Sequence, residues 1–426
     1  MSVSPARTAA FDILLRIERE RAFSSVLLPM YEERLTAADR SLCHELVLGT
    51  LRQQIKLDRI LDALVPGRKL DIEVRIALRL GQYQLQYLTK VPPRAAINES
   101  VELVKRAKKS SASGFANAIL RRASRETVEI QYADDIDQIS VETSHPRWLI
   151  ERWANVLDLD VTARLATSNN EPAKIAFRVI GEPNEKIQEL IASATPSESV
   201  DGCYLLDRST PLLRRCAAEH GVYLQDEASQ MVAHAVDVPQ DGSFLDVCAA
   251  PGGKTGLVAS LTRPKLAIAG DLYQPRVELM RENVRRQGVD VNVVRYDASV
   301  GLPFADESFD AVLVDAPCSG TGTIRHNPEI RYSLEPTDIE ELSFKQRRIL
   351  TEASKAVKKG GLLVYSTCSL ESEEGEDVTN WFAVNSGIPA VKPSVPDRFI
   401  TDTGFARTWP HRDGMDGFFI AAFRKG

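Results

Sequence analysis

The chain has 426 residues, of which 43% are hydrophobic and 26% are charged, and its formal net charge is −6. This length allows two or three globular domains of ordinary composition. No run reaches the roughly 18 apolar residues of a membrane helix, and no secretion signal opens the chain, so we expect a cytoplasmic protein without a membrane partner. The net charge argues against a uniformly basic nucleic-acid binder, although a local patch can still bind RNA.

The six cysteines are too few and too scattered for a disulfide scaffold, and they form no C-x-x-C pair. We therefore expect no metal site. A cysteine commonly fills a core as a small apolar residue, so a reactive role for any of them needs a separate argument.

The first part of the chain, from Ala9 to about Arg125, has a helical pattern. Apolar residues recur at three- and four-residue steps, and Pro66-Gly67 and Pro92-Pro93 punctuate the run. Nowhere in this region do apolar and polar residues alternate one by one over a stretch long enough for a strand. We therefore predict an all-helical domain over residues 1–130.

A basic stretch lies near the end of this helical region. It contains no acidic residue, and its cations are Lys105, Arg106, Lys108, Lys109, Arg121, Arg122 and Arg125. Such a cluster can face the phosphates of a nucleic acid. A solvated helix face beside a serine-rich loop accounts equally well for the charges, so both interpretations stay open.

The composition changes near residues 127–142, where we place a linker. We predict a small α+β module over residues 143–236. Its strands are expected at 175–180 and 202–206, with a helix over 185–192 between them.

Strands and helices alternate strictly over residues 237–426. This alternation predicts a doubly wound, mostly parallel sheet covered on both faces, which is the Rossmann-like α/β class. Ligands of such sheets bind at the carboxyl ends of the strands. The polar residues of this region fall there, in Asp271, Asp297, Asp315 and Ser366-Thr367-Cys368.

A glycine turn, Ala249 to Lys254, follows the first of these strands. It is no P-loop, because Cys248 stands where that motif needs glycine, and it lacks the second glycine of a dinucleotide fingerprint. Asp271 ends the next strand, near the spacing at which a carboxylate binds ribose hydroxyls, and Asp297 repeats the placement on the following strand. Capping a helix is the alternative role for one such residue. Turn and carboxylates together predict an adenosine ligand, for which NAD and S-adenosylmethionine both fit.

Two thiols, Cys318 and Cys368, lie at the ends of neighbouring strands and should reach the same crevice. Hydride transfer needs neither thiol. Methylation at C5 of a pyrimidine needs a thiolate, because that carbon is not nucleophilic until a nucleophile adds at C6. Asp315 can hydrogen-bond the edge of the base to favour the addition, and a base must later remove the C5 proton. Two inert, buried cysteines are the alternative.

At these motifs the chain resembles the RNA 5-methylcytosine methyltransferases of the Nol1/Nop2/Sun family. The matching segments are residues 247–255, 315–322 and 367–369, with 223–229 upstream and 409–419 near the end. The helical region is similar to NusB-type RNA-binding domains, through residues 45–52, 98–103 and 115–122. This combination resembles the bacterial branch of the family that methylates small-subunit ribosomal RNA.

The resemblance implies an S-adenosylmethionine-dependent enzyme that methylates C5 of a cytosine in 16S ribosomal RNA, either unassembled or partly assembled. It implies that Cys368 adds to C6 and that Cys318 assists product release. DNA cytosine methyltransferases use the Pro-Cys thiol as nucleophile instead, so the presence of both thiols favours RNA. The implied cofactor residues are Cys248, Ala249, Ala250, Pro251, Gly252, Gly253, Lys254, Asp271, Asp297 and Asp315. We expect the protein to act as a monomer.

One departure from the family pattern lies in the small module, where relatives usually have Arg-Val-Asn and this chain has Arg178-Val179-Ile180. It argues against a polar role at position 180. Two alternatives remain for the function. One is a tRNA cytosine-5 methyltransferase with the same chemistry, and the other is a non-catalytic RNA-binding or ribosome assembly factor. The intact Cys318, Cys368 and Asp315 argue against the second.

Overall fold

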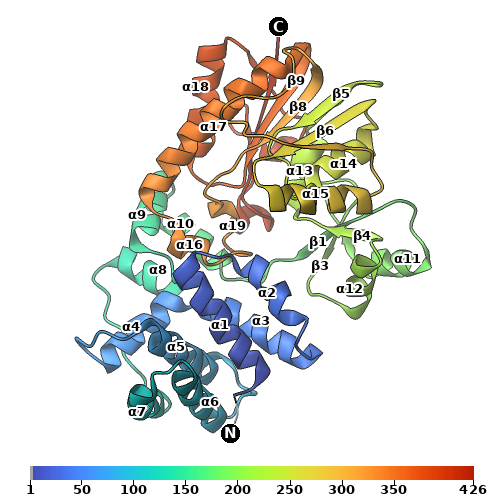
Figure 1. Ribbon diagram of the computed structural model, residues 1–426. Helices are drawn as coiled ribbons and strands as arrows, with labels where there is room; N and C mark the ends of the chain where they lie inside the picture. The colour runs from blue at the N-terminus through green and yellow to red at the C-terminus, as the bar shows by residue number, and fades with distance from the viewer. Residues whose placement is uncertain (1–2) are drawn as a thin grey trace. The chain divides into compact units, whose positions relative to one another are not determined.

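A computed structural model describes residues 3–426 and divides them into two compact units (Figure 1). The first, here called the helical unit, comprises the chain up to Glu171 together with the later segment Ile324–Ser333. The second, here called the sheet unit, comprises Pro172–Thr323 and Leu334–Gly426. No helix in the described range 3–426 is both long enough and apolar enough to cross a membrane.

In the helical unit, the helices between residues 5 and 123 bury their apolar residues in a single core. Three of its helices begin at a residue whose side chain accepts a hydrogen bond from a backbone N–H of the first turn, namely Thr36, Asp134 and Asp158. The elements are α1 (Pro5–Glu20), α2 (Ser24–Glu32), α3 (Ala37–Arg52), α4 (Gln54–Leu64), α5 (Ile72–Tyr87), α6 (Pro93–Arg106), η1 (Ser110–Ala112), α7 (Ser113–Ala123), α8 (Asp135–Thr143), α9 (Arg147–Val156), α10 (Leu159–Ser168) and α16 (Ile330–Ser333). The prediction of an all-helical N-terminal region is confirmed.

The segment Ile324–Ser333 is built into the helical unit although it is far away in sequence. Arg331 is fully buried, and its Nη1 donates to the backbone oxygen of Thr143 and to Oδ1 of Asn170, each at 3.0 Å. Glu329 is also buried and accepts hydrogen bonds from the backbone N and Oγ of Ser24, at 2.6 and 2.9 Å. Because buried polar groups are costly unless paired, these bonds anchor the segment among the helices.

Replacing Arg331 with alanine should destabilise the helical unit by about 3 kcal/mol, because several buried acceptors would lose their donor. The measurement is urea unfolding combined with amide hydrogen exchange in α8 and α10. Arg94→Ala, which truncates an exposed arginine in the same unit, is the matched control. If the amides of α8 and α10 were equally protected from hydrogen exchange in both variants, the anchoring role of Arg331 would be contradicted.

The sheet unit begins with a small antiparallel sheet in the order β2-β3-β1-β4. Its strands are β1 (Ile175–Val179), β2 (Thr195–Pro196), β3 (Cys203–Leu206) and β4 (Val222–Leu224), and its helices are α11 (Glu185–Ala192) and α12 (Pro211–Ala218). The predicted strands near 175–180 and 202–206 and the helix over 185–192 are therefore present. Helices α9 and α10, which the sequence assigned to this module, lie in the helical unit. The domain limits 1–130, 143–236 and 237–426 otherwise stay a prediction.

The main sheet has the order β10-β12-β9-β8-β5-β6-β7, with β11 paired to β12. Strands β5 to β9 are mutually parallel, and β12 runs antiparallel to β9. The strands are β5 (Ser243–Asp246), β6 (Leu266–Asp271), β7 (Asn292–Arg295), β8 (Phe309–Asp315), β9 (Val357–Thr367), β10 (Ala390–Val391), β11 (Ala406–Arg407) and β12 (Phe419–Arg424). The predicted Rossmann-like, mostly parallel sheet is confirmed.

Helices cover both faces of this sheet. They are α13 (Glu227–His234), α14 (Gly253–Thr262), α15 (Gln274–Arg286), α17 (Pro336–Ala356), α18 (Glu376–Ser386) and α19 (Pro410–Asp413), with the short turns η2 (Thr321–Thr323), η3 (Ser372–Glu374) and η4 (Asp397–Phe399). Successive β8 residues face opposite cores, since Leu313 packs with α13 and α14 whereas Val312 packs with α17 and α18. The strand order reverses between β5 and β8, which is where such sheets bind ligands.

Candidate functional site

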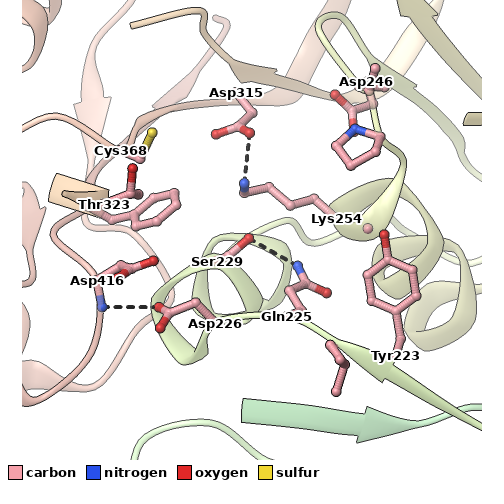
Figure 2. Close-up of a pocket in the computed structure, with 16 residues that line it drawn as sticks. Tyr223, Gln225, Asp226, Ser229, Asp246, Lys254, Asp315, Thr323, Cys368 and Asp416 are labelled. Carbon is pink, nitrogen blue, oxygen red and sulfur yellow. Dashed lines mark hydrogen bonds and ion pairs between the residues drawn. The ribbon is translucent and has the colours of Figure 1, made fainter. Parts of the chain in front are cut away.

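A cavity of about 270 Å³ lies at the carboxyl ends of β5, β8 and β9 (Figure 2). All of its lining residues belong to the sheet unit. They are Tyr223, Leu224, Gln225, Asp226, Ser229, Asp246, Ala249, Ala250, Pro251, Gly253, Lys254, Asp315, Thr323, Cys368, Asp416 and Phe418. The cavity therefore joins the predicted cofactor turn to the predicted nucleophile.

The glycine turn runs from the end of β5 to the start of α14. Gly252 adopts φ 94°, in the left-handed region that favours glycine, and its N–H donates to the Ala249 oxygen at 2.7 Å. The N–H of Ala249 in turn donates to the Gly270 oxygen in β6 at 2.8 Å. A Cβ at Gly253 would lie 2.9 Å from the Tyr223 ring, so only glycine leaves that ring in place. The turn is thus held by β6 at Ala249 and by the Tyr223 ring at Gly253.

Arg178 of β1 supports this turn from the small sheet. Its side chain is buried, and Nη2 donates to the Gly253 oxygen at 3.2 Å and also to Oε1 of Gln287. Gln287 in turn donates to the Gly252 oxygen at 3.3 Å. Burial lowers the pKa of Arg178 to about 10, which leaves the guanidinium charged at neutral pH. Sequence reasoning drew attention to Ile180 in this tripeptide and assigned no role to Arg178.

Lys254 and Asp315 form an ion pair across the cavity, with Nζ 2.7 Å from Oδ2 (Figure 2). Burial alone would lower the pKa of Lys254, but the charge and hydrogen bond of Asp315 outweigh it and raise that pKa. The other carboxylate oxygen of Asp315 accepts from Ser366 Oγ at 2.7 Å. The Lys254 ammonium also lies 5.0 Å from the centre of the Phe418 ring. The pair places a charged hydrogen-bond donor beside a carboxylate at the cavity.

Asp246 is a buried cavity residue that sequence reasoning missed. Its Oδ2 accepts from Thr255 Oγ1 at 2.6 Å, and its Oδ1 is buried without a hydrogen-bond partner among residues 3–426. Burial raises the pKa of Asp246 to about 7. Asp246 ends β5 just as Asp271 and Asp315 end their strands, so the same strand-end rule would have identified it.

The two strand-end thiols meet, with Cys318 Sγ 3.3 Å from Cys368 Sγ. Cys368 lines the cavity, whereas Cys318 is not one of its lining residues. The neighbouring Cys368 thiol, together with burial, raises the pKa of Cys318 well above its usual range. The Cys318 thiol therefore keeps its proton at neutral pH.

Several predicted cofactor residues do not line the cavity, namely Cys248, Gly252, Asp271 and Asp297. Asp271 ends β6, and its Oδ1 accepts from the N–H of Tyr273 at 3.2 Å. Asp297 follows β7 and accepts from the N–H and Oγ of Ser299, at 2.9 and 2.6 Å, which lower its pKa. Burial raises the pKa of Cys248. The cofactor role of these residues stays a prediction.

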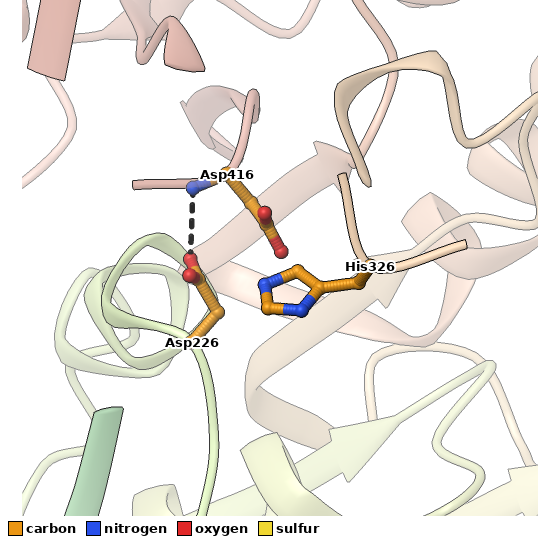
Figure 3. A group of neighbouring side chains, drawn as sticks. All are labelled: Asp226, His326 and Asp416. Atoms are coloured by element: carbon orange, nitrogen blue, oxygen red, sulfur yellow. Dashed lines mark hydrogen bonds between the residues drawn. The ribbon is translucent and has the colours of Figure 1, made fainter. Parts of the chain in front are cut away.

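The segments around Asp226 and Asp416 complete the cavity wall. The N–H of Asp416 donates to Oδ1 of Asp226 at 3.1 Å, so this carboxylate ties the start of α13 to the C-terminal loop (Figure 3). Gln225 Nε2 donates to Ser229 Oγ at 3.1 Å on the same side of the cavity. Both segments belong to motifs that carried the family resemblance, but no role had been assigned to their residues.

Replacing Arg178 with lysine should weaken binding of S-adenosylmethionine, the expected ligand, about tenfold, which corresponds to the loss of one hydrogen bond from a charged group. Lysine cannot donate to Gly253 and Gln287 with the same planar geometry. Titration calorimetry measures the effect. Arg208→Lys, at an exposed position of the same module, should bind as the unmodified protein does. Equal affinities in both variants would refute the supporting role.

Comparisons with known proteins match both parts of the chain. The family described as 16S rRNA methyltransferase RsmB/F matches residues 233–424, and the NusB family matches residues 4–125. The chain is 35% identical to the probable ribosomal RNA small subunit methyltransferase B of Bacillus subtilis (strain 168), over 100% of both chains. It is 31% identical to ribosomal RNA small subunit methyltransferase B of Pseudomonas syringae pv. tomato, over 98% of this chain and 96% of the relative. The crystal structure of PH0851 shares the fold, with a TM-score of 0.85 and 24% identity over 100% of both chains.

Proposed function

Because the chain belongs to the family of 16S rRNA methyltransferases, we propose that it transfers a methyl group from S-adenosylmethionine to C5 of a cytosine in 16S ribosomal RNA. The observation that carries this proposal is the thiol pair that follows β8 and β9, with Cys368 lining the cavity and Cys318 Sγ 3.3 Å from Cys368 Sγ. Methyl transfer to oxygen or to an exocyclic nitrogen would need neither thiol.

The cavity fits S-adenosylmethionine. Its lining holds four carboxylates, on Asp226, Asp246, Asp315 and Asp416, and, among the described residues, a single cation, Lys254. Such a lining favours a ligand that carries a sulfonium and an ammonium group. The buried Oδ1 of Asp246, which has no partner within residues 3–426, is an acceptor suited to an ammonium group. When bound, the cofactor supplies an electrophilic methyl carbon on a sulfonium.

Cys368 is the nucleophile in this mechanism. Its thiolate adds to C6 of the cytosine, and the electron pair of the C5–C6 double bond becomes available at C5 to take the methyl group. Asp315 and Lys254 line the same cavity as Cys368, so they would meet the edge of a base held there, and the Lys254 ammonium would donate a hydrogen bond as charge develops on the ring.

Cys318 is the base for release. Its Sγ lies 3.3 Å from that of Cys368, so in the adduct it is close to the carbon that must lose its proton. Cys318 can then lose its proton to solvent and accept the C5 proton. The C5–H electrons re-form the C5–C6 double bond, and Cys368 leaves C6 as a thiolate. Each thiol thus ends in the protonation state in which it began.

Replacing Cys368 with alanine should abolish methyl transfer, because no other thiol in the described part of the chain lines the cavity. Replacing Cys318 with alanine should leave the RNA covalently attached, because the C5 proton would lack its base. Methyl incorporation and denaturing gels measure the two effects. Cys43→Ala, at a buried cysteine of the helical unit, serves as the control. Full methyl transfer activity in Cys368→Ala would contradict the mechanism.

The helical unit, part of which matches the NusB family, is proposed to hold the surrounding RNA. Within the basic stretch, Lys105, Arg106, Lys109 and Arg122 form ion pairs with neighbouring carboxylates. The remaining cations, Lys108, Arg121 and Arg125, are exposed and have no ion-pair partner in the described part of the chain. These three are therefore the residues most available for phosphates.

Replacing Lys108, Arg121 and Arg125 together with alanine should weaken RNA binding and make it less sensitive to salt. The slope of the logarithm of the binding constant against the logarithm of the salt concentration should become shallower by up to about one unit for each phosphate that loses its cation. Filter binding at several salt concentrations measures this. Lys90, Arg94 and Arg164, exposed cations elsewhere in the helical unit, form a control set with the same loss of charge. An equal effect of both sets would mean that the basic stretch is an ordinary solvated helix face.

The substrate is identified by bisulfite sequencing of ribosomal and transfer RNA from cells with and without the gene. In cells without the gene, one cytosine of 16S RNA is expected to lose its protection from deamination by bisulfite. Loss at a tRNA position instead would establish a tRNA methyltransferase with the same chemistry. No change in either RNA, together with failure to bind S-adenosylmethionine, would establish a non-catalytic RNA-binding factor.

A further inference from the structure

Beneath the two cysteines lies Glu374, at the end of η3. Its side chain is fully buried, and it does not line the cofactor cavity. Burial raises the pKa of Glu374. No lysine, arginine or histidine donates a hydrogen bond to this carboxylate among the contacts of the described residues. A buried acid held entirely by neutral donors is costly, so its placement calls for a physical reason.

The donors come from three separate elements. Oε1 accepts from the backbone N–H of Ser319 and from Nε2 of Gln346, both at 2.9 Å. Oε2 accepts from Oγ of Ser369 at 2.6 Å and from Oγ of Ser319. Gln346 lies on α17 and also donates to the Pro317 oxygen at 3.0 Å. The carboxylate therefore joins α17 to the loops that follow β8 and β9.

Two of these donors belong to the residues that directly follow the thiols, since Ser319 follows Cys318 and Ser369 follows Cys368. The serine hydroxyls also lie 3.1 Å from each other. The N–H of Gly322 donates to the Cys368 oxygen at 2.9 Å, which ties the two loops a second time. Each thiol is thus followed by a serine that donates to the same carboxylate, which fixes the backbone next to both thiols.

We propose that Glu374 is a positioning residue that fixes the two thiols relative to each other. It holds the loops after β8 and β9 in the register at which Cys318 Sγ and Cys368 Sγ lie 3.3 Å apart. Its role in methyl transfer rests on the proposed function, whereas its effect on the thiol geometry does not. Glu374 acts through Ser319 and Ser369 and touches neither cofactor nor base.

Glu374→Gln is the first test variant. The glutamine keeps one oxygen for the Ser319 N–H and Gln346, but its NH₂ group cannot accept from the serine hydroxyls. Ser369→Ala is the second, because it removes one donor and leaves the buried carboxylate in place. Asp377→Asn, at an exposed position near the start of α18, is the matched loss of charge.

The first measurement needs no RNA. Diamide oxidises two thiols to a disulfide and takes up their two electrons and two protons, and peptide mapping quantifies the Cys318–Cys368 disulfide over time. Disulfide formation should be slowed about tenfold or more in Glu374→Gln, less in Ser369→Ala, and not at all in Asp377→Asn, because only the first two loosen the loops.

The second measurement is a single turnover with 16S RNA. The rate of methyl transfer should fall about a hundredfold in Glu374→Gln, as expected for a misplacement on the order of 1 Å, while the affinity for S-adenosylmethionine stays within about twofold. A merely structural role would instead lower affinity, melting temperature and rate together.

The outcomes separate the two proposals. Normal disulfide formation and normal turnover in Glu374→Gln would overturn the positioning role. Should that variant fail to fold, an unchanged disulfide rate in Ser369→Ala would overturn it equally. Slowed disulfide formation, in a protein whose unmodified form methylates no cytosine, would support the positioning role and refute the methylation chemistry.

Discussion

The register of β8 against β9 is the constraint on which the rest of the site depends. Asp315 lies opposite Ser366 in this parallel pair, and the N–H of Ala316 donates to the Ser366 oxygen at 2.9 Å. Cys318 and Cys368 each follow within three residues of that pair, so the two thiols emerge together. A slip by one residue would reverse the facing of every side chain along the strand. The apolar cores on both faces of the sheet prevent such a slip.

The charges in the cavity depend on one another. Lys254 neutralises Asp315 at 2.7 Å, whereas Asp246, in the same cavity, is buried with one oxygen lacking a partner among the described residues. Burial and the nearby Asp315 raise the pKa of Asp246 to about 7. A cationic ligand would stabilise the ionised form of Asp246, so the binding of a sulfonium cofactor and the ionisation of this acid favour each other.

Much of this arrangement was predictable from the sequence, and the residues show why the remainder was not. The strand-end rule located Asp315 and Cys368, because parallel strands bring their carboxyl ends to one edge whatever their order. The predictions of the fold class and of the family are confirmed. Arg178 and Glu374 were missed, because each acts through hydrogen bonds to residues distant in sequence or on other elements. Local pattern also could not show that Arg331 is built into the helical unit.

The identity of the attacking thiol is tested most directly with RNA that carries 5-fluorocytosine. Fluorine at C5 cannot be removed as a proton, so after methyl transfer the adduct cannot collapse and the nucleophile stays attached to C6. Digestion and mass spectrometry of the trapped complex then locate the modified cysteine. We predict that the cross-linked peptide contains Cys368 and that its formation requires S-adenosylmethionine. A cross-link to Cys318, or methylation without any trapped adduct, would contradict the account.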